Sequence, residues 1–142
     1  MTVVRSGFND TLKQDVFDVR YEVFVHEQNV PEEEEIDEHD ETARHFALYN
    51  EEGQAVGAGR MRLLDDAGKA ERIAVRASFR KSGAGRQLME AIEKEAAAEG
   101  KGKIKLHAQL QALPFYKSLG YTVTSEEFFD AGIPHHAMEK QL

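Results

Sequence analysis

The stretch from Glu71 to Gly100 constrains the fold of this chain most, because a short strand, a basic turn with two glycines and a long helix follow one another within it. The run Ile73-Ala74-Val75 is apolar and typical of a buried strand. Apolar residues then recur at helical spacing, at Leu88, Met89, Ile92 and Ala96. The N–H groups at a helix start lack partners within the helix and attract anions. We therefore expect an anion-binding turn between this strand and this helix.

The turn has the sequence Arg80-Lys81-Ser82-Gly83-Ala84-Gly85 and is followed by Arg86. A Walker A loop requires a Ser or Thr after its Gly-Lys pair, and the pairs that begin at Gly68 and Gly100 lack it. The Rossmann fingerprint requires three glycines, whereas this turn has two. A plain strand-to-helix turn remains the alternative to a phosphate site.

Length and cysteine content limit the class of protein. The 142 residues suffice for one substantial core, so we expect residues 1–142 to form a single domain. The chain has no cysteine, which excludes disulfides, thiolate metal sites and a cysteine nucleophile and fits a reducing compartment. No signal-peptide pattern and no apolar run near the roughly 18 residues of a membrane span are present. We therefore expect a soluble cytoplasmic protein with no membrane partner.

The net charge of -8 comes from one acidic segment, residues 32–41, in which eight of ten residues are Asp or Glu. The other acidic residues equal the 18 Lys and Arg in number, so no basic stripe for nucleic acid is expected. The segment lacks the spaced ligands and the glycine of an EF-hand, and the six histidines have no metal-ligand spacing, so we expect no metal. A solvated loop is one interpretation of this segment. The other is a loop beside an active site, where its charge would attract a cationic amine.

The order of the predicted elements indicates a mixed α/β (α+β) fold. Residues 2–8 form a first strand, and Thr11 opens a helix that ends near Gln28. Three further strands, at 43–49, 55–64 and 71–75, are separated by short turns and predict an antiparallel meander. The strand at 103–109 follows the central helix, so we expect it to lie parallel to the strand at 71–75. A short helix and another strand follow.

Two motifs carry a resemblance to a known family. The pattern Arg-x-x-Gly-x-Gly that begins at Arg80 resembles the acetyl-CoA pyrophosphate loop of the GCN5-related N-acetyltransferase (GNAT) superfamily. The series Gln109, Ala112, Phe115-Tyr116 and Leu119-Gly120-Tyr121 resembles the second GNAT signature. Residues 20–31 and 132–138 are similar to a bacterial ElaA-like branch. The resemblance implies a GNAT fold, with a mixed central sheet of six to seven strands, about four helices and two central parallel strands that splay apart.

The resemblance also implies a chemistry, which is direct acetyl transfer from acetyl-CoA to an amine acceptor that is a small molecule. It implies no metal and is compatible with a homodimer. The cosubstrate would be held by Ile73, Ala74, Val75, Arg80, Lys81, Ser82, Gly83, Ala84, Gly85, Arg86, Gln109 and Phe115. The chain departs from the family pattern at Gln109, where Asn is common, and at Lys81-Ser82. The alternative is a non-catalytic CoA-binding or regulatory protein that keeps the cradle and has lost turnover.

Tyr116 matches the family tyrosine and is the expected general acid. A phenol is a proton donor at neutral pH, because its reference pKa is about 10. Core packing of a short amphipathic helix is its alternative role.

The general base has three candidates. Glu71 lies on the strand beside the proposed thioester, where strand alternation places it on the same face as Ile73 and Val75. Glu27 ends the first helix. His107 lies on the neighbouring strand, and the reference pKa of histidine, near 6.5, suits the task. Each candidate also has a structural alternative as an ion-paired or hydrogen-bonded residue.

Overall fold

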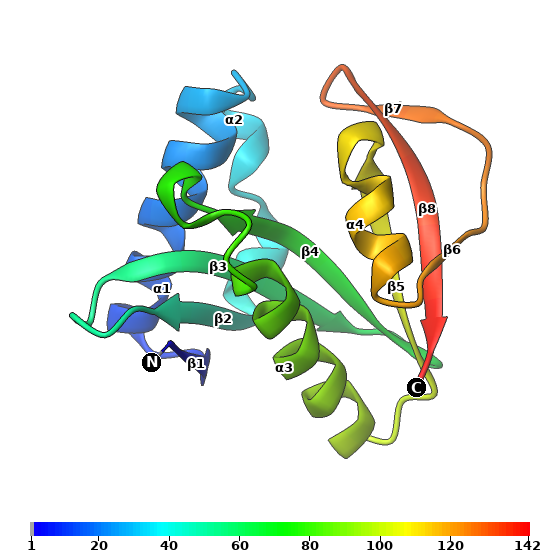
Figure 1. Cartoon of the computed structure of the whole chain (residues 1–142), viewed down its shortest axis with the longest axis horizontal. Coiled ribbons are helices and arrows are strands. Elements are labelled where there is room, and N and C mark those ends of the chain that lie inside the picture. The colour runs from blue at the N-terminus through cyan, green and yellow to red at the C-terminus, as the bar shows by residue number, and fades with distance from the viewer. Residues whose placement is uncertain (1) are drawn as a thin grey trace.

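The computed structural model describes residues 2–142 (Figure 1). Its α-helices are α1 (Asp10–Arg20), α2 (Glu32–Glu35), α3 (Ala84–Ala98) and α4 (Leu113–Ser118). A π-helix, η1 (Tyr21–Glu27), extends α1, and three 3-10 turns are η2 (Glu38–Glu41), η3 (Ala77–Phe79) and η4 (Leu110–Ala112). The strands are β1 (Val3–Gly7), β2 (Arg44–Tyr49), β3 (Ala55–Leu63), β4 (Ala67–Val75), β5 (Lys103–Gln109), β6 (Thr122–Val123), β7 (Phe128–Asp130) and β8 (Ile133–Gln141). Within 2–142, helices that are both long and apolar enough to cross a membrane are absent.

All eight strands belong to one mixed sheet. Their order is β1-β2-β3-β4-β5-β8-β6, and β7 pairs with β8. The first four strands form antiparallel neighbours, which confirms the predicted meander. β4 and β5 are parallel, as predicted, and β8 returns antiparallel to β5. The sheet therefore has a parallel pair at its centre and antiparallel strands on both sides.

The parallel pairing of β4 and β5 is short. It joins Ala67–Ala70 to Lys103–Leu106, and beyond these residues the two strands diverge (Figure 1). The predicted pairing at residues 71–75 is therefore wrong, because β4 begins at Ala67 and its paired part comes first. Gly68 lies in this strand and packs against Met61, Ala96 and Ile104, where a Cβ atom would come within 2.8 Å of the Met61 sulfur. Close packing explains this glycine.

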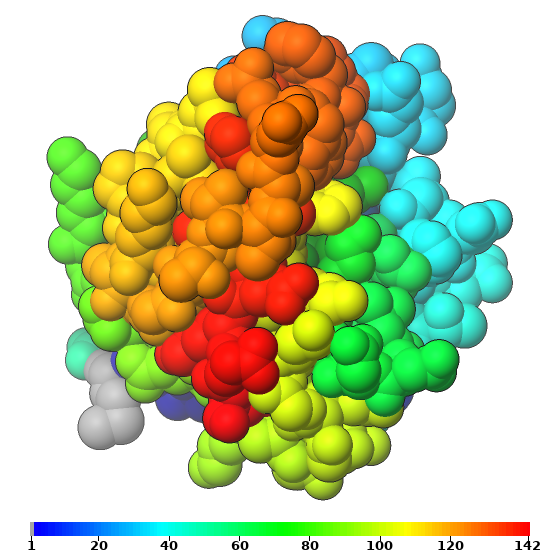
Figure 2. Space-filling model, turned by 90° about the vertical axis from the view of Figure 1, so that its right-hand side faces the viewer, coloured from blue at the N-terminus to red at the C-terminus, as the bar shows by residue number. Residues whose placement is uncertain are grey.

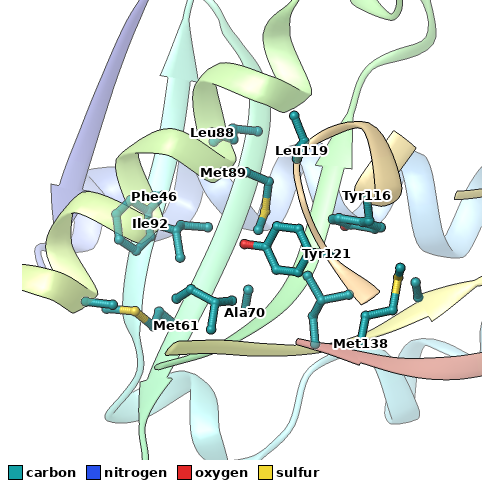
Figure 3. Close-up of a cluster of buried hydrophobic side chains, with 14 of the residues drawn as sticks. Phe46, Met61, Ala70, Leu88, Met89, Ile92, Tyr116, Leu119, Tyr121 and Met138 are labelled. Carbon is teal, nitrogen blue, oxygen red and sulfur yellow. The ribbon is translucent and has the colours of Figure 1, made fainter. Parts of the chain in front are cut away.

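The larger core lies on the face of the sheet that α3 and α4 cover. The four apolar residues of the predicted helix stripe, Leu88, Met89, Ile92 and Ala96, are fully buried. They pack with Phe46, Met61 and Met138 from the sheet and with Tyr116, Leu119 and Tyr121 from α4 and the residues after it (Figure 3). Burying a side chain of the size of Leu or Ile stabilises a fold by roughly 1.5–3 kcal/mol. This core fixes α3, and with it the turn before α3, against the sheet.

The opposite face is covered by α1 and η1. Leu12, Val16, Val19 and Val23 pack there against Ala47, Ala58 and Ala74. The predicted helix thus buries the expected face and ends at the expected residue, because Gln28 is the C-cap of η1. Its start differs, since the side chain of Asn9 accepts a hydrogen bond from the Leu12 N–H at 2.8 Å and caps α1 before Thr11.

Candidate active site

A cleft of about 580 Å³ opens where β4 and β5 diverge. Ile73 from β4, His107 and Gln109 from β5 and Tyr116 from α4 line its inner part. The residues around α2 form one wall, and the turn between β7 and β8 forms the opposite wall. In Figure 1, α2 and β7 lie on opposite sides of the gap between the diverging strands. In Figure 2, the segment that leads into β7, in orange, covers much of β8, in red, from outside. Residues that are distant in the sequence therefore meet in one cleft.

Tyr116 packs in the core and also lines the cleft. Its side chain is only 8% exposed and its ring makes edge contacts with Phe115 and Tyr121, at centroid distances of 5.0 and 5.7 Å. It also lines the cleft, and within residues 2–142 its hydroxyl has no hydrogen-bond partner. Burial raises the pKa of Tyr116 above that of a free phenol, so the hydroxyl keeps its proton at neutral pH. A ligand in the cleft would meet a protonated hydroxyl.

The turn before α3 has the backbone of an anion site. Lys81 and Gly83 both have positive φ, of 62° and 88°, and Gly83 is the N-cap of α3. The cap has no side-chain hydrogen bond, so the first N–H groups of α3 are left without a side-chain acceptor. The helix dipole adds partial positive charge at the same place. The geometry suits a phosphate.

Gly85 serves a different purpose from Gly83. Its φ is not positive, but a Cβ atom there would lie 2.9 Å from the Phe115 ring. The glycine allows α4 to pack closely against the start of α3. The two motifs found in the sequence are therefore in direct contact.

Arg80 and Glu27 form an ion pair. Two Arg80 nitrogens donate to the two Glu27 oxygens, each at 2.7 Å, and Arg80 Nε also donates to the Val75 carbonyl at 2.8 Å. The hydrogen bond from Arg80 lowers the pKa of Glu27 below its usual value. Glu27 is thus ionised and bound to Arg80 of the basic turn. These contacts make it a weak candidate for the general base.

A β-bulge changes the direction of the Glu71 side chain. The pairing of β3 with β4 shifts between Ala58 and Arg60, and Arg72 has a positive φ of 56°. Ile73 packs in the core beneath α3, whereas Glu71 pairs with Arg60 beneath the acidic segment. The prediction that Glu71 and Ile73 share a face is therefore wrong, because the extra residue in the bulge reverses the alternation.

Three cations surround the Glu71 carboxylate. Arg60, Arg62 and Lys69 approach it at 3.0, 2.9 and 3.2 Å. Burial alone would raise the pKa of Glu71, but the hydrogen bond from Arg62 and the charges of Arg60 and Lys69 outweigh burial and lower the pKa to about 2. A carboxylate this acidic is a poor proton acceptor near neutral pH, so the structure favours the ion-pair role of Glu71.

Three of the eight acidic residues of the segment are not solvated as in a loop. Glu35 and Asp40 are each 4% exposed, and both bind the fully buried Arg20, with distances of 2.6 Å. Asp37 and Asp40 bind Arg60 at 2.7 and 2.9 Å. The interpretation as a solvated loop is wrong for these residues, because two arginines from α1 and β3 draw them inward. Isolated basic residues in apolar stretches were the only sequence signal for this network.

The rest of the segment places negative charge on the cleft. Glu33, Glu34, Glu35 and Asp37 line it, and in the described chain Glu33 and Glu34 take part in no ion pair. Arg72, at the bulge, donates to the Glu35 carbonyl at 3.0 Å and to Asp37 at 3.3 Å. The acidic wall is therefore tied to β4, which lines the inner part of the cleft.

His107 and Gln109 lie side by side along the β5 edge of the cleft. Burial lowers the pKa of His107, and the charge of Lys69 lowers it further, so this imidazole is neutral at neutral pH. Gln109 Nε2 donates to Gln28 Oε1 at 2.8 Å and joins β5 to the end of η1. Within residues 2–142, no cluster of three or more His, Asp or Glu side chains is arranged to hold a metal ion.

Comparison with known proteins decides the family. The family model of the acetyltransferase (GNAT) domain matches residues 9–142. The chain belongs to the GNAT acetyltransferases. This confirms the family and the GNAT fold expected from the two motifs, and GNAT membership makes the chain an acyltransferase.

Relatives with high coverage agree. An uncharacterised N-acetyltransferase of Bacillus subtilis, YjcF, is 53% identical over 133 residues, which cover 93% of this chain and 94% of that protein. The crystal structure of Escherichia coli ElaA superposes with a TM-score of 0.86 at 25% identity and covers 99% of both chains. An acyl-CoA N-acyltransferase from Pseudomonas aeruginosa superposes with a TM-score of 0.83 at 26% identity and also covers 99% of both.

Proposed function

We propose that residues 1–142 form one catalytic domain, which transfers an acetyl group from acetyl-CoA directly to the amino group of a small cationic acceptor. The observation that carries this proposal is the cleft between the diverging strands. Carboxylates without an ion-pair partner in the described chain line this cleft, and so does Tyr116, whose neighbour Phe115 packs against Gly85 at the start of α3. A chain without cysteine suits a reducing compartment, so the cytoplasm is the expected place of this reaction.

The acetyl-CoA end is supported by the backbone. Beyond Ala70 and Leu106 the facing edges of β4 and β5 have no strand partner, so their N–H and C=O groups are available to an extended chain such as pantetheine. The pyrophosphate would lie at the N–H groups of Ala84 to Arg86, near Arg80. Acetyl-CoA supplies an acetyl thioester, whose carbonyl carbon is the electrophile.

We assign Tyr116 as the proton donor to the leaving group, which is the sulfur of CoA. Its protonated hydroxyl lines the cleft and has no protein partner to compete for it. Donation of that proton or a hydrogen bond to the departing CoA sulfur would stabilise the charge that develops there. Holding amine and thioester together in the cleft would contribute further, because orientation replaces an encounter in solution.

The acceptor end is supported by charge. Glu33 and Glu34 have no cationic partner in the described chain and face the cleft. Low-dielectric walls strengthen their attraction for a cation. An amine that arrives protonated would be drawn to this end and must lose a proton before it can attack.

A panel of primary amines with a readout of free CoA thiol tests the proposal. We expect acetyl-CoA to be consumed only in the presence of an acceptor, and cationic diamines to be better acceptors than neutral or anionic amines of the same length. Mass spectrometry of the product should show one added acetyl group on nitrogen. Tight acetyl-CoA binding with no acceptor-dependent thiol release across the panel would instead support a non-catalytic CoA-binding protein.

A further inference from the structure

His135 is a buried imidazole in the cleft and is distinct from the residues that the sequence suggests for catalysis. It lies on β8 directly opposite Gln109 of β5, and its side chain is 8% exposed. Paired residues of antiparallel neighbours share a face of the sheet, so His135 points to the same side as Gln109 and His107. All three line the cleft.

The protonation of the His135 ring follows from one hydrogen bond. Its Nδ1 lies 2.7 Å from the carbonyl oxygen of Ile133. A carbonyl can only accept, so Nδ1 carries the proton and donates it. In the neutral ring, Nε2 then holds a free lone pair. The backbone thus selects the tautomer in which Nε2 is a base.

That lone pair is open to the cleft. Nε2 of His135 has no hydrogen-bond partner among residues 2–142. Among residues 2–142, Nδ1 of His45 is the one side-chain nitrogen or oxygen that has neither a hydrogen-bond partner nor contact with solvent. Nε2 of His135 also has no partner there, so it must be in contact with solvent. An imidazole that lines the cleft, is almost buried and keeps one accessible nitrogen is arranged to contact a ligand.

An aromatic neighbour fixes the plane of the ring. Phe128 stacks on His135 with an interplanar angle of 19° and a centroid distance of 5.9 Å. The other neighbour of Phe128 is His107, which meets it edge-on at 4.9 Å. His107 is more exposed than His135 and has no hydrogen bond in the described chain that selects its tautomer. Of the two imidazoles, His135 is therefore the better positioned.

We propose that Nε2 of His135 is the general base that deprotonates the acceptor amine. This inference rests on the proposed function and adds to it a residue that is distinct from the three candidates named from the sequence. Glu71 and Glu27 are occupied by arginines, whereas Nε2 of His135 is occupied by nothing in the described structure.

The proton balance assigns one proton to His135. The reaction converts R–NH3+ and acetyl-S-CoA into R–NH-acetyl, HS-CoA and one H+. His135 takes that H+ from the ammonium group and passes it to water in the cleft. The neutral nitrogen then forms the N–C bond while the C–S bond breaks. The second proton that nitrogen loses balances the one that sulfur gains, and Tyr116 delivers the latter and is reprotonated by water.

Several ionisable groups face His135 across the cleft. His107 is on β5, Asp130 on β7, and Lys69 and Glu71 on β4. Glu33, Glu34, Glu35, Asp37 and Arg72 line the farther wall. Of the nearer groups, Lys69 and Glu71 are paired with each other at 3.2 Å. His107 is the imidazole on the strand next to His135, so the experiment has to separate these two.

The test uses His135→Asn in the full chain, because the Asn amide can still donate to the Ile133 carbonyl but cannot accept the amine proton. On an amine that the parent acetylates, we expect the turnover number to fall by roughly 100-fold. The acid limb of the pH–rate profile that follows an imidazole should disappear, while acetyl-CoA affinity stays within about twofold. His136→Gln is the matched control. That ring lies on the adjacent residue of β8, binds the Ser125 carbonyl and does not line the cleft, so its turnover and pH profile should be unchanged.

A second measurement is independent of turnover. In the 15N-histidine spectrum of the parent at pH 8, the signals that vanish in His135→Asn should belong to a ring with protonated Nδ1 and unprotonated Nε2. A ring with protonated Nε2 would overturn the proposal. So would loss of the acid limb in His107→Gln together with its retention in His135→Asn. Failure of the parent itself to acetylate any amine would refute the proposed function instead, so the two failures are distinguishable.

Discussion

The carboxylate of Glu27 and the guanidinium of Arg80 form a two-point ion pair, in which both N–O distances are 2.7 Å. The pair joins the end of η1 to the turn before α3. Arg80 is the basic side chain that the pyrophosphate motif would use, so Glu27 and a phosphate would compete for the same cation. In the described structure, Glu27 therefore neutralises the arginine that the motif would use.

Glu27→Gln should strengthen acetyl-CoA binding, because it removes the internal competitor for Arg80. An ion pair this exposed is worth roughly 0.2–1 kcal/mol, so we expect the dissociation constant to fall by about 1.5- to 5-fold in calorimetric titration. Glu22→Gln is the control, because it frees Arg76 outside the turn by breaking a pair of 2.6 Å. Weaker binding in Glu27→Gln would show that the pair positions Arg80 for the phosphate.

Gly83→Asp should abolish the thermal stabilisation that acetyl-CoA provides, because it adds a carboxylate at the start of α3. Gly53→Asp is a matched control. Both glycines have positive φ, 88° and 80°, and an added Cβ meets nothing within 4 Å at either one. Both variants should lose similar intrinsic stability, and only Gly83→Asp should lose the ligand-induced shift of the melting temperature. Equal ligand-induced shifts of the melting temperature in the two variants would show that the phosphate does not bind at this turn.

Tyr116→Phe should lower turnover by roughly 10- to 1000-fold and leave acetyl-CoA affinity nearly unchanged, because only a proton donor is lost. Its melting temperature should change little, since the hydroxyl has no partner within residues 2–142. Tyr121→Phe should lower the melting temperature and leave turnover unchanged. It removes a hydrogen bond of 2.8 Å to Glu93, which is worth about 1 kcal/mol of stability. Full turnover in Tyr116→Phe would show that Tyr116 is not the proton donor and only packs in the core.

Replacing Glu33 and Glu34 by Gln should raise the Michaelis constant of a cationic amine by a few-fold at low salt. The effect should shrink as salt is added, because exposed charges are screened over about 8–10 Å at ordinary ionic strength. Glu35 is excluded from the variant, since it holds the buried Arg20. The control replaces Glu126 and Glu127 by Gln, which changes the net charge equally but away from the cleft. Identical amine kinetics in both double variants at low salt would mean that the acidic wall does not contact the acceptor.

Glu71→Gln should cost stability at neutral pH and little at very low pH. The pKa of Glu71 is lowered from 4.5 to about 2, so its ionised form stabilises the fold above about pH 4.5, and this contribution is lost as pH falls toward 2. The shift corresponds to about 3 kcal/mol as an upper value. Urea unfolding of parent and variant at several pH values measures the difference. A difference in unfolding free energy that does not change with pH would show that the negative charge of Glu71 does not stabilise the fold.

The predicted base at Glu71 shows where reasoning from the sequence fails. Alternation along 71–75 assumes a regular strand, and one bulge at Arg72 is enough to reverse the side chain. The bulge residue also reaches across to the carbonyl of Glu35 and to Asp37, so its conformation depends on a segment more than thirty positions away in the chain. No local pattern reports such a contact.

The features that depend on near neighbours in the chain could be predicted from the sequence alone. The stripe of Leu88, Met89, Ile92 and Ala96 follows from the period of the helix, and the glycine-containing turn before it follows from the backbone freedom of Gly83. Three features emerge only in the folded chain: which carboxylates are buried, which carboxylates face the cleft, and the position of His135 beside Gln109. These outcomes depend on strand register and on pairing with arginines from other elements, because a charged side chain is buried only where the fold brings it a partner.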